Sequence, residues 1–195
     1  HTRSSAASDV YKRQESCGVD AIVAEGFEAG GHNGREETTT MCLVPDVAKA
    51  INVPLIAAGG IIDGKSMLAA MILGADGVQM GTRFVACKES SAHENFKNMV
   101  LKAKEGDTRL TLKEITPVRM MKNKFFQEVE ELYKTSPSKE QLLNKLGRGR
   151  AKLGMFEGDL EAGELEIGQA SSQINKVFTA QEIIQQIVKE FNSIK

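Results

Sequence analysis

The chain has 195 residues, with 25 Lys and Arg against 26 Asp and Glu and a formal net charge of -1. This length fits one ordinary domain or part of a larger one. A hydrophobic fraction of 41% beside 26% charged residues excludes a disordered or fibrous chain. The balanced charge and the lack of Trp argue against a nucleic-acid partner, and the short apolar runs argue against a membrane-spanning helix.

Three cysteines, at positions 17, 42 and 87, form no CxxC pair and are odd in number. This usage favours a reducing compartment, so we expect a cytoplasmic protein. Cys42 and Cys87 stand among apolar residues, which is typical of small core residues. No HExxH or DxDxDG pattern occurs in the sequence, so no metal site is expected.

The first fourteen residues (HTRSSAASDVYKRQ) differ in character from the rest of the chain, because they contain only two bulky apolar residues, Val10 and Tyr11. They also lack the apolar core of a secretory signal. We predict that residues 1–14 are a non-native or disordered tail, and they take no part in the fold expected below.

Residues 15–90 read as βα units of a parallel sheet. Short apolar runs predict buried strands at 19–24, 53–58 and 77–80, and helical spacing predicts helices at 41–51 and 65–73. A strand followed by a glycine loop and a helix recurs about every 25 to 35 residues, which is typical of βαβ topology. Each glycine loop follows the carboxyl end of its strand, where such folds hold their active sites.

Residues 91–167 change to a helical segment. Ser91 and Glu94 have the spacing of a capping box for a helix through about 104, which leaves His93 in a solvent-facing first turn. Amphipathic helices are expected at 122–134 and 137–147, and a glycine-rich loop at 147–168. Residues 168–195 then form a closing loop and a helix at 179–194, with one apolar face made by Ile183, Ile184, Ile187, Val188 and Phe191.

Two glycine turns suggest a phosphate site. One contains Gly59 and Gly60; the other follows Gln79 and Met80 and contains Gly81 and Thr82. Glycines let backbone N–H groups approach an anion closely, the next helix adds its positive end, and a threonine adds a hydroxyl donor. The alternative is that the ends of parallel strands need glycine only to turn.

His32 lies in a third glycine loop, Gly30-Gly31-His32-Asn33-Gly34. At a strand end it would act as a general base or position a substrate oxyanion. The alternative is a histidine in a solvent-exposed turn. A small basic cluster at Lys145, Arg148, Arg150 and Lys152 would meet a pyrophosphate or an acidic carrier protein, or would remain a solvated loop.

Three ordered motifs carry a resemblance: AEG at 24–26 with EAGGHNG at 28–34, AAGGI at 57–61, and GADGVQMGTRF at 74–84. In these motifs the chain resembles the nitronate monooxygenase (2-nitropropane dioxygenase-like) family, which includes flavin-dependent enoyl-acyl-carrier-protein reductases. The resemblance implies a TIM (β/α)8 barrel that binds FMN. It implies that the FMN phosphate and its neighbouring groups are bound by Gly59, Gly60, Gln79, Met80, Gly81 and Thr82. Gly30 and Gly31 would shape the loop near the flavin, and His32 would be the active-site histidine.

A complete (β/α)8 barrel usually needs about 250 residues. If the loops at Gly59 and Gly81 follow strands seven and eight, residues 19–24 form strand six. We therefore expect an α/β fold that is the C-terminal part of a TIM barrel, with an inserted helical segment and with the N-terminal strands missing. The truncated chain is expected to be a poor or inactive enzyme.

The function expected from the resemblance is an FMN-dependent oxidoreductase that oxidises alkyl nitronates with O₂. One alternative is an enoyl-acyl-carrier-protein reductase that uses FMN with NAD(P)H as co-substrate. Two others are a non-catalytic phosphate-binding fragment and a phosphate-binding barrel with isomerase or aldolase chemistry. The expected partner is a small-molecule substrate, either a nitronate or an enoyl thioester. Whether the protein assembles as a homodimer is left undecided by the sequence.

Overall fold

The structure, a computed structural model, describes residues 6–195, with side chains from residue 9 onward. In the first half of the chain, strands and helices follow one another, with two consecutive strands at one point. They are α1 (Ala6–Ser16), β1 (Ile22–Glu25), β2 (Gly31–His32), α2 (Thr40–Ala48), β3 (Leu55–Ala58), α3 (Gly64–Ile72), β4 (Gly77–Gln79) and α4 (Thr82–Val85). The second half contains α5 (Glu94–Val100), β5 (Thr108–Thr111), β6 (Val118–Met121), α6 (Lys124–Tyr133), α7 (Lys139–Leu146), a π-helical turn η1 (Lys152–Phe156), a 3-10 turn η2 (Gln169–Gln173) and α8 (Ala180–Ile194).

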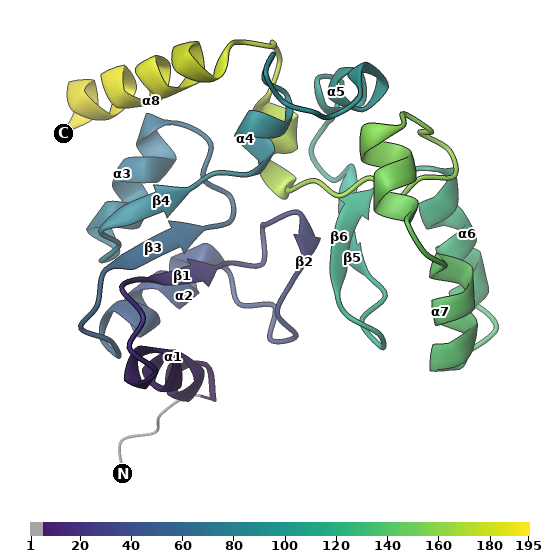
Figure 1. Ribbon diagram of the computed structural model, residues 1–195, viewed down its shortest axis with the longest axis horizontal. Coiled ribbons are helices and arrows are strands. Elements are labelled where there is room, and N and C mark those ends of the chain that lie inside the picture. Colours follow the sequence, from purple (N-terminus) through teal and green to yellow (C-terminus); the bar gives the residue numbers. More distant parts are fainter. Residues whose placement is uncertain (1–5) are drawn as a thin grey trace.

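Strands β1, β3 and β4 form a parallel sheet in the order β1-β3-β4 (Figure 1). Ile22 pairs with Leu55, and Ile56 pairs with Gly77. The three strands predicted at 19–24, 53–58 and 77–80 are thereby confirmed, as is their parallel arrangement. The carboxyl ends of all three strands lie at one edge, and the glycine loops follow them.

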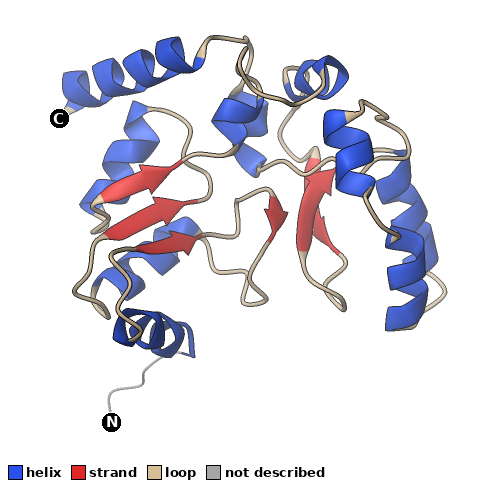
Figure 2. Cartoon of the chain, in the orientation of Figure 1, coloured by secondary structure: helices blue, strands red, loops and turns tan. Residues whose placement is uncertain are grey.

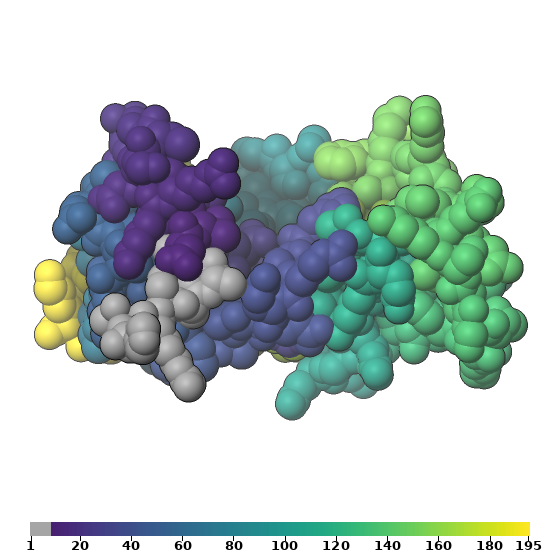
Figure 3. All heavy atoms as spheres, turned by 90° about the horizontal axis from the view of Figure 1, so that it is seen from below, coloured from purple at the N-terminus to yellow at the C-terminus, as the bar shows by residue number. Residues whose placement is uncertain are grey.

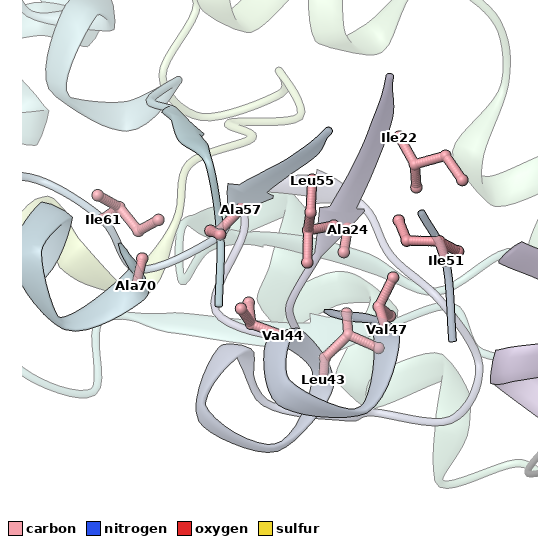
Figure 4. Close-up of a cluster of buried hydrophobic side chains, with 11 residues drawn as sticks. Ile22, Ala24, Leu43, Val44, Val47, Ile51, Leu55, Ala57, Ile61 and Ala70 are labelled. Atoms are coloured by element: carbon pink, nitrogen blue, oxygen red, sulfur yellow. The ribbon is translucent and has the colours of Figure 1, made fainter. Parts of the chain in front are cut away.

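The core of this sheet lies between its strands and α2 (Figure 4). β1 alternates between buried and exposed residues, so that Ile22 and Ala24 point into the core while Val23 remains 45% exposed. Leu55 of β3 and Val44 of α2 are almost fully buried in the same cluster. Within the described residues, β1 and β4 are edge strands with no further partner, so this sheet is open on both sides.

Helix α8 packs on α3. The contact is close at Gly64, where an added Cβ would lie 2.4 Å from the backbone nitrogen of Phe191. Ile183, Ile187 and Phe191 are buried as predicted, whereas Ile184 and Val188 are 53% and 46% exposed, so the predicted five-residue apolar face is only partly covered. None of the helices in the described part of the chain is long and apolar enough to cross a bilayer.

A second sheet, β2-β6-β5, is antiparallel and lies beside the first, and helices flank the two groups of strands (Figure 2). The description of residues 91–167 as a helical segment was therefore wrong for β5 and β6, although helices α5, α6 and α7 are confirmed. All four residues of β6 are buried, and one of them is Arg119. Strand β6 has no alternation of buried and exposed residues, and a charged residue interrupts its apolar run. Hydrophobic periodicity therefore does not reveal this strand in the sequence.

The loop after β2 reaches this second sheet. In Figure 3 the segment around residue 35 lies against the turn of the β5–β6 hairpin. The Arg35 guanidinium donates hydrogen bonds to the carbonyls of Lys113, at 2.9 Å, and Ile115, at 2.8 Å. These contacts tie the His32 loop to the antiparallel sheet.

The structure corrects the prediction of a disordered tail for residues 6–14, which belong to α1; residues 1–5 lie outside the described part of the chain. Tyr11 packs against the core of the parallel sheet, and Glu15 accepts hydrogen bonds from the backbone nitrogens of Asn52 and Val53. A helix with few apolar residues is stable here because it packs on a preformed surface.

Two single-residue predictions were also wrong. His93, rather than Ser91, is the N-cap of α5, since its Nδ1 accepts a hydrogen bond from the Asn95 nitrogen at 3.1 Å. Cys42 is exposed on α2 rather than buried, while Cys87 is buried as expected. Cys42 neighbours Leu43 and Val44 in sequence but points away from the face they bury.

Candidate functional site

A cavity of about 210 Å³ opens where the parallel strands end. Its walls combine glycines from three loops, one threonine, two glutamates and a group of apolar side chains. The lining residues are Glu25, Ala29, Gly30, Gly59, Gly60, Ile61, Gly81, Thr82, Val85, Met155, Glu166, Ile167 and Ala170. Of the predicted site residues, Gly30, Gly59, Gly60, Gly81 and Thr82 are brought together here.

The other predicted residues lie around this cavity without lining it. Gly31 pairs with Arg119 in the antiparallel sheet, and His32, next to it, is exposed and pairs with Val118. Gln79 is the exposed last residue of β4. The Met80 side chain packs into the hydrophobic clusters beneath the sheet and α8, and Met80 does not line the cavity.

The glycines of the two predicted phosphate loops differ in what the fold requires of them. Gly59 and Gly60 have φ values of +92° and +71°, and a Cβ on Gly59 would lie 2.7 Å from the Gly26 carbonyl oxygen. Turning the chain and packing the loops explain these two glycines. Gly81 has φ of -89° and nothing within 4 Å of an added Cβ, so the protein itself does not require glycine there.

Backbone donors are also available at these loops. Within residues 6–195, the amide nitrogens of Gly60 and Gly81 donate no hydrogen bond to another protein group, whereas that of Gly59 faces the Gln79 carbonyl at the end of the β3–β4 ladder. Because Gly60 and Gly81 both line the cavity, the arrangement offers N–H groups to an acceptor placed there. A phosphate, a carboxylate or a ring carbonyl would satisfy them.

The predicted help from a helix N-terminus is wrong for α3. Its first turn is closed by Asp63, whose side chain accepts from the Ser66 nitrogen at 2.8 Å, and the Gly64 nitrogen donates to Glu190 at 2.8 Å. These carboxylates already occupy the positive end of the helix. Thr82 begins the single turn α4, and its Oγ1 accepts the Gly168 N–H at 3.0 Å, which leaves its own proton to be donated.

Glu28 and Thr40 hold the glycine loops in place. The Glu28 carboxylate accepts the Thr40 N–H at 3.0 Å, and the Thr40 hydroxyl lies 2.8 Å from the Gly59 carbonyl oxygen. The Glu28 carbonyl accepts the Gln169 N–H at 3.0 Å. Three loops far apart in the sequence are thus joined through one glutamate. Residue patterns gave no reason to select Thr40, although Glu28 stands within the EAGGHNG motif.

Arg119 anchors the same loop from the antiparallel sheet. It is only 2% exposed, its Nε and Nη2 donate to the Phe27 carbonyl at 3.1 and 2.8 Å, and its guanidinium stacks on the Phe27 ring. Burial lowers the pKa of Arg119, and the nearby charges of Glu28 and Glu37 oppose that shift. Arg119 thereby fixes the approach of the chain to Gly30, Gly31 and His32.

Two carboxyl groups line the cavity. Glu25 lies between this cavity and a smaller one, and desolvation there raises its pKa. Glu166 has a raised pKa because of burial, which the charge of His32 partly offsets. Glu166 escaped the sequence interpretation. The signal for it was alternation: Glu164 and Glu166 alternate with Leu165 and Ile167, which are both almost fully buried.

The predicted basic cluster is mostly engaged inside the protein. Lys145 bonds to Glu128, and Lys152 forms an ion pair with Glu157. Arg150 stacks on Phe125 and donates to the carbonyls of Leu146 and Ala162. These contacts leave little of the cluster to meet a pyrophosphate or an acidic carrier protein, so the alternative of a basic loop without a ligand role fits better.

Known proteins match the chain over nearly its whole length. A family model described as nitronate monooxygenase matches residues 2–190. A probable nitronate monooxygenase of Staphylococcus saprophyticus is 38% identical over 194 residues, which span 92% of this chain and 53% of that protein.

Solved structures agree with this match. FabK from Thermotoga maritima is 40% identical, with a TM-score of 0.87, over 96% of this chain and 59% of that one. The nitroalkane oxidase of Streptomyces ansochromogenes is 28% identical, with a TM-score of 0.76, over 95% of this chain and 55% of that one. The chain therefore spans about half the length of its relatives. By the extent of the family-model match and the agreement of fold, the chain belongs to the nitronate monooxygenase family.

Proposed function

We propose that this chain is part of an FMN-dependent oxidoreductase that oxidises alkyl nitronates with O₂. The family match and the curated relatives named probable nitronate monooxygenases support this reaction class. FMN would supply the electron-transfer chemistry, and the protein would bind it, orient it and place the substrate. We place the enzyme in the cytoplasm, on the basis of its cysteine usage.

The main observation behind the proposal is the part of the cavity wall that Gly81 forms. This residue lines the cavity, has open space at its Cβ position and offers an unpaired N–H. Gly60 offers a second unpaired N–H at the same cavity. A glycine that the fold does not need is explained by a ligand that lies against it. The donors fit an anionic phosphate, and the Thr82 hydroxyl adds another.

The residues then take separate roles. Gly59, Gly60, Gly81 and Thr82 would hold the phosphate, with Gln79 and Met80 contributing through their backbone. Gly30 and Gly31 would shape the loop beside the flavin. His32 would be the base or polar group above the ring; it borders the site from β2, and its exposure leaves it accessible to a substrate.

We also propose that the complete fold is a TIM barrel of which this chain holds the C-terminal part. The open edges of β1 and β4 and the partial coverage of the relatives support that reading. Additional strands would pair with these edges and complete the flavin site. We expect the 195-residue chain alone to turn over substrate poorly, and a homodimer is the assembly to test for.

Flavin binding tests the proposal. The chain is fused to the part of the Staphylococcus saprophyticus relative that it does not span, and FMN binding is followed by fluorescence quenching. Gly81→Val should weaken binding at least about tenfold, since a side chain would occupy the ligand's space. The control Gly34→Ala, in another exposed loop at ordinary φ, should bind like the parent. The proposal fails if the parent binds no FMN or if Gly81→Val binds it equally well.

A second candidate reaction is the reduction of an enoyl thioester by NAD(P)H through FMN. The apolar side of the cavity, with Ile61, Val85 and Ile167, would suit an acyl chain. Oxidation of propionate 3-nitronate with O₂ is assayed beside reduction of a crotonyl thioester with NADH or NADPH. Turnover of the thioester alone would replace nitronate oxidation by this second reaction.

A further inference from the structure

Residues 164–167 cross between the antiparallel sheet and the cavity. The Met121 nitrogen donates to the Leu165 carbonyl at 2.9 Å, and Met120 forms an isolated antiparallel bridge with Glu166. Leu165 and Ile167 are buried in the core cluster beside α5. Since alternate residues of an extended segment point to opposite sides, the side chains of Glu164 and Glu166 share the other side.

Glu166 reaches both the cavity and the neighbourhood of His32. It lines the cavity, and its Oε2 would lie 2.6 Å from a Cβ on Gly31, the residue before His32. Glycine at position 31, with φ of +78°, therefore leaves the space that this carboxyl occupies. Burial raises the pKa of Glu166, and the charge of His32 opposes the rise.

Glu164 is the buried member of the two. It is 6% exposed, and within the described residues its Oε1 has no hydrogen-bond partner. The cation that faces it, Arg150, uses its Nε and Nη1 for the carbonyls of Leu146 and Ala162. An ionised carboxylate is strongly disfavoured in such surroundings. Burial and the charge of Glu166 raise the pKa of Glu164 to about 7, against the opposing charge of Arg150.

We propose that Glu164 and Glu166 form one carboxyl pair that holds a single proton beside the cavity, with Glu166 acting as a positioning residue for His32. The buried Oε1 of Glu164 has no donor among the described residues, and a second carboxyl follows two residues later on the same side of the segment, so one proton stays with the pair. The charged groups that face the pair are Arg150, in the helical turn that leads into η1, and His32, from β2. The role toward His32 rests on the function proposed above, whereas the shared proton does not need the flavin.

A titration of the carboxyl groups tests this inference. The whole 195-residue chain, without flavin, is labelled with ¹³C at the glutamate carboxyls and titrated by NMR. Glu164→Gln and Glu166→Gln assign the signals. We expect Glu164 to titrate near neutral pH, and its midpoint to fall by about one pH unit in Glu166→Gln, because a like charge is removed. The control Glu161→Gln, an exposed residue of the same loop, should leave both midpoints unchanged.

The contrary results are equally specific. A Glu164 midpoint like that of exposed glutamates, or one that does not move in Glu166→Gln, would overturn the pair. If either Gln variant fails to fold, His32→Gln probes the interaction between Glu166 and His32, because His32 is exposed and its replacement should not disturb the core. It should raise the Glu166 midpoint, and no change would remove His32 from the inference.

A turnover measurement separates this inference from the function on which its last step rests. In the fused, flavin-loaded protein, Glu166→Gln should displace the pH profile of turnover, while Glu161→Gln should not. An unmoved profile would end the positioning role. Loss of flavin binding with the carboxyl titrations intact would overturn the proposed function and leave the pair standing.

Discussion

The two sheets are stabilised in different ways. The parallel unit, β1, β3 and β4 with α2 and α3, has a core of aliphatic side chains, and Thr40 is its one buried polar residue among those described. The antiparallel unit, β2, β5 and β6 with α5, α6 and α7, buries several polar or charged residues. Those in or beside its elements are Lys97, Thr111, Arg119, Asn123 and Glu164.

This difference explains why one unit is easier to recognise in the sequence than the other. A strand packed by apolar contacts appears as an apolar run, and its period and length are visible. A segment held by polar side chains that bond to distant carbonyls looks like surface sequence until its partners are known. If the two units depend on different interactions, truncation of the apolar core in the parallel unit should have the largest effect, and loss of a single polar group there the smallest.

Truncation of the apolar core should damage the parallel unit most. Leu55→Ala removes a side chain that is 1% exposed and should lower the free energy of unfolding by about 3 kcal/mol. Chemical denaturation measures the change. Ile72→Ala is the control, because Ile72 is 76% exposed and should change stability by less than about 0.5 kcal/mol. Equal losses for both variants would contradict this account of the core.

Loss of one polar side chain should damage the antiparallel unit nearly as much. Asn123 caps α6 through the Phe126 nitrogen, and its Nδ2 bonds to the carbonyls of Leu160 and Gly163 at 2.8 Å. Asn123→Ala should cost about 2 kcal/mol, because buried carbonyls lose their donor. Ser138→Ala removes an exposed cap from α7 and should cost about 1 kcal/mol or less. If the order of the two is reversed in denaturant titrations, burial of the cap is not what matters.

Glu164 should make the stability of the fold depend on pH. Its pKa is raised to about 7 in the folded chain, so the folded state holds the proton more tightly than the unfolded state. Its stabilising contribution is complete below about pH 4.5 and is lost as the pH rises through 7. Glu164→Gln should flatten this decline by about 1 to 2 kcal/mol between pH 5 and 8. Thermal unfolding across this range measures it, and a decline of unchanged size in the variant would refute the assignment.

The smallest effect is expected where a polar group serves the parallel unit. Thr40→Val removes the hydroxyl beside the Gly59 carbonyl and should cost about 1 kcal/mol, with weaker FMN binding in the fused protein. Thr39→Val is the matched control, since Thr39 is exposed and makes no side-chain cap hydrogen bond. The same loss in both variants would mean that replacing any hydroxyl at the start of α2, and not the hydrogen bond to the Gly59 carbonyl, sets the result.

The sequence was informative wherever structure is local. The strands ending near Glu25, Ala58 and Gln79 follow from short apolar runs, and the closing helix follows from the apolar spacing of residues 183–191. The glycine loops were placed correctly because turns have residue preferences that act over a few positions. The same reasoning missed α1, β5 and β6, whose stability comes from the surfaces on which they lie.

By itself, the sequence determined the parallel βα order and the glycines that meet at the strand ends. Only the tertiary structure decided which of those glycines surround the cavity. It showed that Gln79 and the Met80 side chain do not line it. It also brought Glu28, Thr40 and Glu166 to the site. The reason is physical: period and turn chemistry are properties of neighbouring residues, whereas a cavity wall and a raised carboxyl pKa depend on burial by segments more than a hundred residues away.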